Sequence, residues 1–268
     1  MSTLKLGVGL NGAAGRMGQM LTRLIVQGEE FKLEAALEAA GHPDIGRDIG
    51  EISGVGPTGI LVADRLPECG PEVMVDFSSP EATAECARHC AKRKIPMVIG
   101  TTGLADKQLD AVMAASTTVP VVLAPNMSVG VNVLLALVGQ AARMLGGDYD
   151  VEIVETHHRF KKDAPSGTAL KLAERIAEVM DRDIRCDLVH GRQGQVGARS
   201  QREIGVHAVR AGDVVGDHVV TFATMGERIE LVHRAHSRET FARGALRAAR
   251  FVADKPAGLY TMADVLGL

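Results

Sequence analysis

The stretch Leu4–Gly18 decides the fold of the first part of the chain, and it reads Leu-Lys-Leu-Gly-Val-Gly-Leu-Asn-Gly-Ala-Ala-Gly-Arg-Met-Gly. Its apolar half, Leu4–Leu10, predicts a buried parallel strand, and the apolar spacing from Met20 to Ile25 predicts a helix directly after the glycines. Strand, glycine turn and helix in this order are typical of dinucleotide binding, because backbone without Cβ atoms can approach a pyrophosphate at a helix N-terminus. The spacing is Gly-x-x-Gly-x-x-Gly rather than Gly-x-Gly-x-x-Gly, so the motif alone also fits a glycine turn without a ligand.

An acidic residue follows the next apolar segment. Phe31–Leu37 predicts a second strand, and Glu38 stands at its end. A carboxylate in this place can accept hydrogen bonds from the ribose hydroxyls of an adenosine. A lone glutamate would more simply be a surface residue, but after a glycine turn the ribose interpretation is favoured.

Three further apolar segments, at 73–77, 96–99 and 119–124, alternate with helical patterns, and each ends in small polar residues. This alternation predicts a doubly wound parallel sheet, in which ligands bind at the carboxyl ends of the strands. The Gly-, Pro- and Asp-rich segment Gly41–Thr58 predicts a loop with little regular structure.

The pattern changes after Ser128. A long apolar helix is predicted over 129–145, followed by a strand over 151–156 and a helix from Gly167 to about Met180. Strand-like runs then follow at 204–210, 218–225 and 229–235, and they suit a mixed sheet with mainly antiparallel neighbours. We expect the final helix, over 240–254, to return to the first domain.

Composition narrows the class of protein. The 268 residues carry 30 Lys plus Arg against 33 Asp plus Glu, and a net charge of -3 predicts no general attraction to nucleic acid or to a membrane. The four cysteines contain no Cys-x-x-Cys pair, so neither a disulfide framework nor a metal site is indicated. The start of the chain lacks a signal segment, and no stretch approaches 18 uninterrupted apolar residues. We therefore expect a soluble cytoplasmic protein.

Polar residues gather in Glu155–Leu170, which reads Glu-Thr-His-His-Arg-Phe-Lys-Lys-Asp-Ala-Pro-Ser-Gly-Thr-Ala-Leu. Adjacent histidines and nearby cations suit proton transfer on a small anion, and the Ser166-Gly-Thr turn adds backbone N–H groups at a helix start. A solvated basic loop with an ordinary N-cap is the simpler interpretation of any one of these residues. The whole run favours an anion-binding site.

Five segments together resemble the 4-hydroxy-tetrahydrodipicolinate reductases, also called dihydrodipicolinate reductases, of lysine biosynthesis. They are the glycine turn Asn11–Gly18, Asp76-Phe77, Gly100–Gly103, Asn126–Asn132 and Glu155–Thr168. The resemblance covers essentially the whole chain and implies reduction of 4-hydroxy-tetrahydrodipicolinate, a cyclic dicarboxylate, to tetrahydrodipicolinate by NADH or NADPH with loss of water. It also implies an α/β fold: a Rossmann-type doubly wound parallel sheet over 1–127, completed by 238–268, and a C-terminal α+β domain with a mixed sheet over 128–237. The second domain would bind substrate and form a homotetramer.

The resemblance also implies roles for single residues. His157 corresponds to the proton donor/acceptor of the family and Lys161 to its proton donor, while His158, Gly167 and Thr168 match its substrate-carboxylate contacts. Glu38 would hold the adenosine ribose. The remaining cofactor contacts form two groups: Gly12, Ala13, Ala14, Gly15, Arg16 and Met17 would hold the pyrophosphate, and Gly100, Thr101, Thr102, Ala124, Pro125, Asn126 and Met127 would line the nicotinamide side.

One departure from the family pattern concerns the cofactor. Many relatives place arginine directly after the ribose-binding glutamate, where it can meet the 2′-phosphate of NADP, but here Ala39 and Ala40 follow Glu38. We therefore expect NADH to be preferred over NADPH.

Two other functions are worth comparison. A semialdehyde dehydrogenase needs an activated cysteine, and none of the four cysteines stands at a strand end with a glycine or helix N-terminus beside it. A dinucleotide sensor without catalysis has no use for His157, Lys161 and the Ser166-Gly-Thr168 turn. Turnover of the cyclic imine would separate these functions.

Overall fold

The computed structural model describes residues 4–268, and the chain divides into two compact units. The first unit ends at Val129 and takes in Glu239–Gly267, while the second comprises Gly130–Arg238 and Leu268. Residues 1–3 of the expected N-terminal domain lie outside the described residues.

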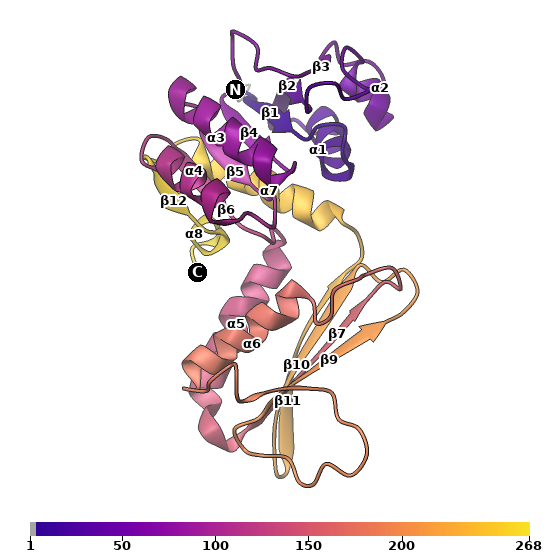
Figure 1. Cartoon of the computed structure of the whole chain (residues 1–268), viewed down its shortest axis with the longest axis vertical. Coiled ribbons are helices and arrows are strands. Elements are labelled where there is room, and N and C mark those ends of the chain that lie inside the picture. Colours follow the sequence, from indigo (N-terminus) through magenta and orange to yellow (C-terminus); the bar gives the residue numbers. More distant parts are fainter. Residues whose placement is uncertain (1–3) are drawn as a thin grey trace. The chain divides into compact units, whose positions relative to one another are not determined.

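The first unit is an α/β structure around one parallel sheet (Figure 1). Its elements are β1 (Leu6–Asn11), α1 (Arg16–Gln27), β2 (Phe31–Leu37), α2 (Ile49–Ser53), β3 (Val62–Ala63), β4 (Val73–Asp76), α3 (Pro80–Arg93), β5 (Met97–Ile99), α4 (Asp106–Ser116), β6 (Pro120–Leu123), α7 (Glu239–Val252), β12 (Gly258–Tyr260) and α8 (Met262–Leu266). The strand order is β12-β6-β5-β4-β1-β2-β3, and every neighbouring pair is parallel. The predicted doubly wound sheet is confirmed.

The apolar strands explain the core of this unit. Val8 and Leu10 of β1 are fully buried, as expected of a strand with helices on both faces. Ala245, Ala249 and Val252 of α7 belong to the same buried cluster, so the C-terminal helix packs on the sheet of the first unit. This packing brings the two ends of the sequence into one core.

The segment predicted to be loop contains a short helix that the sequence interpretation missed. Asp48 caps α2, because its carboxylate accepts from the N–H groups of Gly50 and Glu51, and it also accepts from those of Thr58 and Gly59. One side chain thus holds a glycine-rich segment that shows no helical periodicity.

The second unit is a five-stranded sheet with two helices. Its elements are α5 (Val129–Leu145), the 3-10 turn η1 (Gly146–Asp148), β7 (Asp150–His157), α6 (Gly167–Val179), β8 (Leu188–His190), β9 (Ile204–Arg210), β10 (Gly216–Thr224) and β11 (Glu227–Ala235). The strand order is β11-β10-β7-β9-β8. Buried side chains of α5 and α6 share one cluster with those of the sheet, so the helices cover one face, as Figure 1 shows.

The predicted mixed sheet is confirmed, but the expectation of mainly antiparallel neighbours was wrong. The pairs of β10 with β7 and β11 are antiparallel, whereas β9 pairs in parallel with both β7 and β8. The helix α6 lies between β7 and β8, and a crossover through a helix returns the chain in the same direction, so β8 runs parallel to β7.

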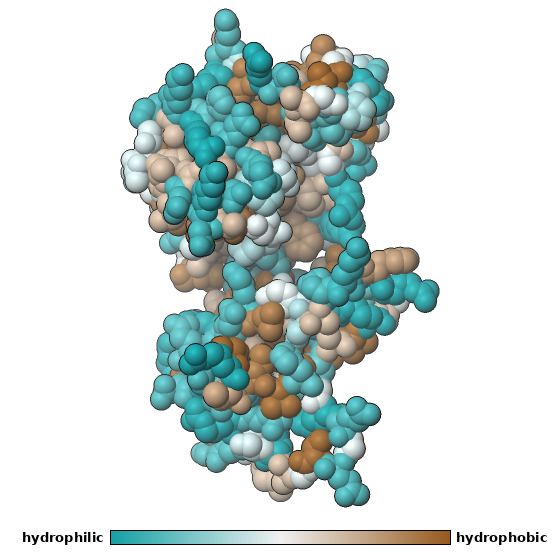
Figure 2. Space-filling model, in the orientation of Figure 1, coloured by the Kyte–Doolittle hydropathy of each residue, from teal (hydrophilic) through white to brown (hydrophobic). Residues whose placement is uncertain are grey.

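The helix α5 was predicted at its observed bounds. Counted together with η1 it is, by length and composition alone, the one helix among residues 4–268 that is long and apolar enough to cross a membrane. Leu134, Val138 and Ala142 pack into the core of the second unit, and core helices pass the same test, so this is weak evidence for a span. On the face that Figure 2 shows, brown apolar side chains are interrupted by teal polar ones.

Candidate active site

The glycine turn joins β1 to α1, and each of its three glycines has a different surrounding. Gly12 has a φ of 79°, and a Cβ there would stand 2.4 Å from the Phe77 carbonyl oxygen. A Cβ on Gly18 would stand 2.3 Å from the carbonyl oxygens of Gly12 and Ala13, so this glycine lets the helix approach the turn. Gly15 is the exposed N-cap of α1, and a Cβ there would meet only the Gly12 carbonyl oxygen, at 3.2 Å.

Glu38 meets the glycine turn. The N–H of Ala14 donates to Glu38 Oε1 at 2.9 Å, because β1 and β2 are parallel neighbours and end at the same edge of the sheet. The structure therefore joins the two sequence signals for a dinucleotide. Arg16 is exposed and Met17 half-buried beside them.

A cavity of about 600 Å³ lies beside this edge of the sheet. It is lined by Asn11, Leu37, Glu38, Ala39, Ala40, Asp64, Arg65, Leu66, Ala82, Glu85, Cys86, His89 and Arg93. Arg65 and Arg93 were missed by the sequence interpretation, since they come from separate segments. The Arg93 guanidinium donates to the carbonyl oxygens of Pro67 and Glu68, which leaves Arg65 as the lining arginine without a hydrogen bond or ion pair among the described residues.

A buried carboxylate organises the neighbouring strand ends. Asp76 at the end of β4 is fully buried, and it accepts from Asn11 Nδ2 (3.2 Å), Ser78 N–H (3.0 Å) and Thr101 Oγ1 (2.9 Å). Burial raises the pKa of Asp76, and side-chain hydrogen bonds from Ser78, Asn11 and Thr101 oppose the shift. Thr101 in turn accepts from the Ser78 N–H, so one network links β1, β4 and the residues after β5.

The other residues predicted for the nicotinamide side follow β5 and β6. Gly100 is buried, and a Cβ there would overlap the Phe77 ring at 2.1 Å, whereas Thr102 and Pro125 are exposed. Ala124 is buried. The Asn126 side chain accepts from the Ser128 N–H at 2.9 Å. Met127 is 1% exposed and belongs to the hydrophobic core, so only its backbone is available to a ligand at this edge.

A second polar cluster lies in the second unit around Glu155, which is fully buried in β7. Glu155 Oε2 accepts from Arg210 Nη1 (2.9 Å) and lies 2.6 Å from His157 Nδ1. Its Oε1 accepts from Arg210 Nη2 (2.9 Å) and from the Ser166 N–H (3.0 Å). Burial works to raise the pKa of Glu155, but the Arg210, His157 and Ser166 bonds outweigh it and hold the pKa below its ordinary value.

Histidines extend this cluster across the sheet. The rings of His157 and His218 are 5.3 Å apart, and those of His218 and His233 are 6.2 Å apart. His218 Nε2 lies 3.2 Å from Ser166 Oγ. Burial lowers the pKa of His218 to about 4, so this ring is neutral at neutral pH. Burial also lowers the pKa of His157, while Glu155 raises it.

The predicted substrate contacts lie around the start of α6 and on the loop before it. Ser166 caps α6, with its Oγ accepting from the Ala169 N–H, and Gly167 and Thr168 form the first turn. Lys161 Nζ donates to both carboxylate oxygens of Asp163, at 2.9 and 2.8 Å, and this bond lowers the pKa of Asp163. His158 is half-buried, and its Nδ1 is buried without a hydrogen-bond partner.

Three residues of this cluster were not predicted. Glu155 stood in the quoted stretch without a role, and Arg210 and His218 come from strands far along the chain. A charged residue at the end of a predicted strand is a weak signal, and the sequence offers no other for Arg210. Among residues 4–268 no group of three His, Cys, Asp or Glu side chains could hold a metal ion.

Comparison with known proteins gives full-length similarity. Models of the family "Dihydrodipicolinate reductase" match residues 6–127 for its N-terminus and residues 130–266 for its C-terminus. A 4-hydroxy-tetrahydrodipicolinate reductase of Anaeromyxobacter sp. strain Fw109-5 is 52% identical over 261 residues, which are 97% of each chain. One of Nitrosospira multiformis is 49% identical over 270 residues, covering 100% of this chain and 99% of the relative.

Solved structures agree with the sequence similarity. A dipicolinate-bound dihydrodipicolinate reductase from Paenisporosarcina sp. TG-14 has a TM-score of 0.75 at 27% identity, covering 97% of this chain and 99% of the other. GenD2 from gentamicin A biosynthesis, solved in complex with NAD, has a TM-score of 0.58 at 12% identity and shares the fold alone.

Proposed function

The chain belongs to the dihydrodipicolinate reductase family, and from this premise we propose how its residues divide the work of the reaction. It is an oxidoreductase that reduces 4-hydroxy-tetrahydrodipicolinate to tetrahydrodipicolinate with loss of water, in lysine and diaminopimelate biosynthesis. Its Rossmann-type first unit uses NAD(P)H. The assignments of single residues that follow are our proposal.

We propose that the glycine turn, Gly12 to Met17, binds the pyrophosphate of the cofactor. Its fit rests on Gly15, where the exposed backbone at the N-terminus of α1 has no Cβ to keep an anion away. Glu38, already at the turn through Ala14, is the proposed ribose acceptor. The proposed nicotinamide side consists of Gly100, Thr101, Thr102 and Ala124 to Met127, with the Met127 side chain in the core.

The second unit carries the proposed proton chemistry. When bound, the reduced nicotinamide supplies a hydride to an electron-poor carbon of the substrate ring, and negative charge then moves towards the ring nitrogen. Lys161 donates the compensating proton, and His157 serves as proton donor and acceptor beside it. His158, Gly167 and Thr168 bind the carboxylates of the small cyclic substrate at the helix N-terminus.

We propose that NADH binds more tightly than NADPH. Ala39 and Ala40, rather than a cationic residue, directly follow Glu38. The Glu38 carboxylate would repel a 2′-phosphate and would lose its hydrogen bonds to the ribose. Arg65 and Arg16 are the nearby arginines that would reduce the difference. NADPH remains the second cofactor.

We also propose a cytoplasmic homotetramer. On the sheet face opposite α5 and α6, Val219 of β10 pairs with Val154 and with Val232, and the last two are 37% and 47% exposed. A row of apolar side chains across three strands suits contact with other copies of the chain. Sedimentation of the wild type and of Val232→Asp tests this: the variant should dissociate.

Family membership carries the proposed activity, and a turnover assay tests it. Purified protein with freshly prepared 4-hydroxy-tetrahydrodipicolinate should consume NADH, and the consumption should stop when the cyclic substrate is omitted. A protein that binds NADH but turns over no cyclic imine would be a sensor. The proposed catalytic roles of His157 and Lys161 would then be wrong.

A further inference from the structure

Glu155 is a fully buried carboxylate of the second unit, and its two oxygens serve different parts of the site. One oxygen contacts the His157 imidazole and the other holds the Ser166 N–H at the start of α6. A fully buried carboxylate is stable only when it is paired and hydrogen-bonded, which Arg210 achieves with one bond to each oxygen. Glu155 therefore holds both His157, which is proposed to transfer a proton, and the turn at Ser166, which is proposed to bind a carboxylate.

The short contact defines the protonation of His157. A carboxylate only accepts hydrogen bonds, so Nδ1 of His157 carries the proton that lies between them. Nε2 is then the nitrogen that gains or loses a proton. A Cβ on Gly216 would stand 3.0 Å from Nε2, so any other residue at this position would crowd that nitrogen.

The same carboxylate is linked to the loop that carries Lys161. Arg210 Nη2 donates to the Asp163 carbonyl oxygen at 2.6 Å as well as to Glu155. The Asp163 side chain in turn holds the Lys161 ammonium. Loss of the Glu155 charge would thus leave Arg210 unbalanced and would loosen this loop too.

We propose that Glu155 is a positioning residue of the reductase reaction, which fixes the proton-bearing nitrogen of His157 and the first turn of α6 in one arrangement before substrate binds. The inference rests on the proposed function, because it assigns a task to Glu155 only if His157 transfers a proton and the turn binds a carboxylate. Groups that act on a substrate need supporting hydrogen bonds to hold their geometry.

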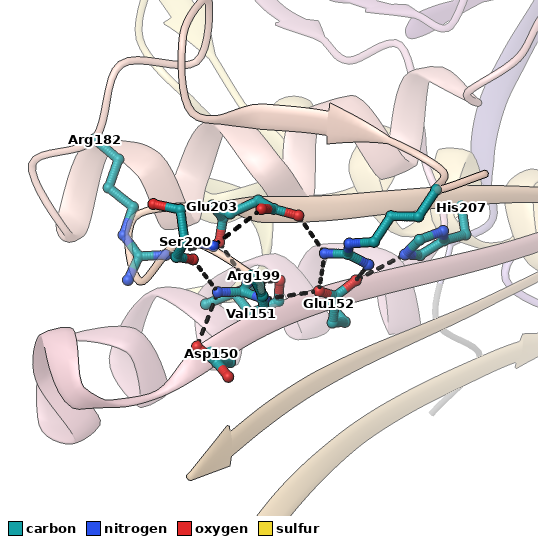
Figure 3. A network of polar contacts seen from close by, with 9 residues as sticks. Asp150, Val151, Glu152, Arg182, Arg199, Ser200, Glu203 and His207 are labelled. Atoms are coloured by element: carbon teal, nitrogen blue, oxygen red, sulfur yellow. Dashed lines mark hydrogen bonds and ion pairs between the residues drawn. The ribbon is translucent and has the colours of Figure 1, made fainter. Parts of the chain in front are cut away.

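Glu152 offers a matched control on the same strand. It points to the opposite face of β7, and its carboxylate accepts from Arg192 and Arg199 and lies 2.7 Å from His207 Nε2. Figure 3 shows Glu152 between Arg199 and His207. Both glutamates therefore have arginine and histidine partners. Only Glu155 adjoins the proposed site, so a purely structural role would make the two positions behave alike.

The charged and titratable groups around Glu155 are few. They are His157 on its own strand, Arg210 on β9, His218 on β10, and Lys161 with Asp163 on the loop. Glu155 raises the pKa of His157, whereas burial, Lys161 and Arg210 lower it. Glu155→Gln removes the negative charge that raises the pKa of His157. The part of the kcat–pH profile that reports the protonation of His157 should therefore move to lower pH.

The experiment compares Glu155→Gln with Glu152→Gln in three measurements. The first two are kcat against pH and competition by pyridine-2,6-dicarboxylate. The third is the proton uptake that accompanies binding of this dicarboxylate, measured by calorimetry in buffers of different ionisation enthalpy. Glu155→Gln should lower kcat by about tenfold or more, part of the roughly 10²- to 10⁴-fold effect of a positioned acid or base. It should also weaken the dicarboxylate and shift proton uptake to lower pH. Glu152→Gln should leave all three unchanged at equal oligomeric state.

Equal behaviour of the two variants, or an unshifted pH profile in Glu155→Gln, would overturn the inference. If Glu155→Gln does not fold, Arg210→Lys keeps the positive charge but supplies one donor group in place of the paired bonds, and it should move kcat and proton uptake in the same direction. A wild-type profile in Arg210→Lys would count against the proposal. If the wild-type protein itself fails to bind the dicarboxylate, the proposed function fails instead.

Discussion

The three glycines of the turn allow the structural and the ligand-binding requirements of one motif to be separated. In Gly18→Ala the new Cβ would lie 2.3 Å from two backbone carbonyl oxygens, so α1 must move by about 1 Å to reach an ordinary contact distance. Overpacking of this kind costs about 1–3 kcal/mol, and the better helix propensity of alanine returns at most about 1 kcal/mol. We expect a net loss of roughly 1–2 kcal/mol, or a Tm lower by roughly 2–8 °C.

Gly15→Ala should behave differently. Its Cβ would meet a single atom at 3.2 Å, and the residue has an ordinary φ of -69°, so the cofactor-free protein should lose no more than about 1 kcal/mol, as alanine is a poorer N-cap than glycine. The methyl group would stand at the proposed pyrophosphate site, however. We expect the Kd for NADH to rise by about tenfold or more, which at saturating NADH removes about 1.4 kcal/mol of cofactor-dependent stabilisation.

Thermal melts with and without NADH, together with fluorescence titration of NADH, distinguish the two variants. Gly18→Ala should lower the Tm in both conditions, and Gly15→Ala should mainly reduce the increase in Tm that NADH produces. If Gly15→Ala binds NADH like the wild type, the pyrophosphate does not approach this backbone and the proposed cofactor site is wrong.

Four further outcomes are expected. Lys161→Ala should lower kcat by roughly 10²-fold or more with little change in NADH affinity, whereas Lys171→Ala, exposed on α6, should leave both unchanged; steady-state kinetics and NADH titration decide this. Thr168→Glu should abolish competition by pyridine-2,6-dicarboxylate through like-charge repulsion, and equal inhibition would place the carboxylate site elsewhere. Ala39→Arg should gain about tenfold in affinity for NADPH but not for NADH in paired titrations; a wild type that already prefers NADPH would point to Arg65 or Arg16. For Glu152, burial works to raise the pKa, but the Arg192, His207 and Arg199 bonds lower it from 4.5 to about 2. The stabilisation that the ionised Glu152 contributes is therefore present above pH 4.5 and is lost as the pH falls towards 2. At about 1.4 kcal/mol per pH unit, Glu152→Gln should remove up to roughly 3 kcal/mol of this pH-dependent stability, measured by urea unfolding at a series of acid pH values.

The sequence by itself determined the elements that depend on local signals. The strand, glycine turn and helix at the start of the chain, the bounds of α5 and the start of α6 at Gly167 all follow from apolar spacing and turn residues. Glu38 was also placed correctly at the end of β2, because the apolar run that predicts this strand ends at Leu37. Its contact with Ala14 follows because parallel strands end at the same edge of a sheet. The short helix α2 was missed, since its stability comes from hydrogen bonds to Asp48 rather than from periodicity.

Only the tertiary structure decided which distant residues complete the second polar cluster. Arg210 lies 55 positions from Glu155, and His218 lies 52 positions from Ser166, yet each pair is in hydrogen-bonding distance. Alternation of side chains along a strand shows which face a residue occupies, but not which strand lies beside it or in which register. The pairing of β7 with β9 and β10 sets that register, and it does so through the packing of the whole sheet against α5 and α6.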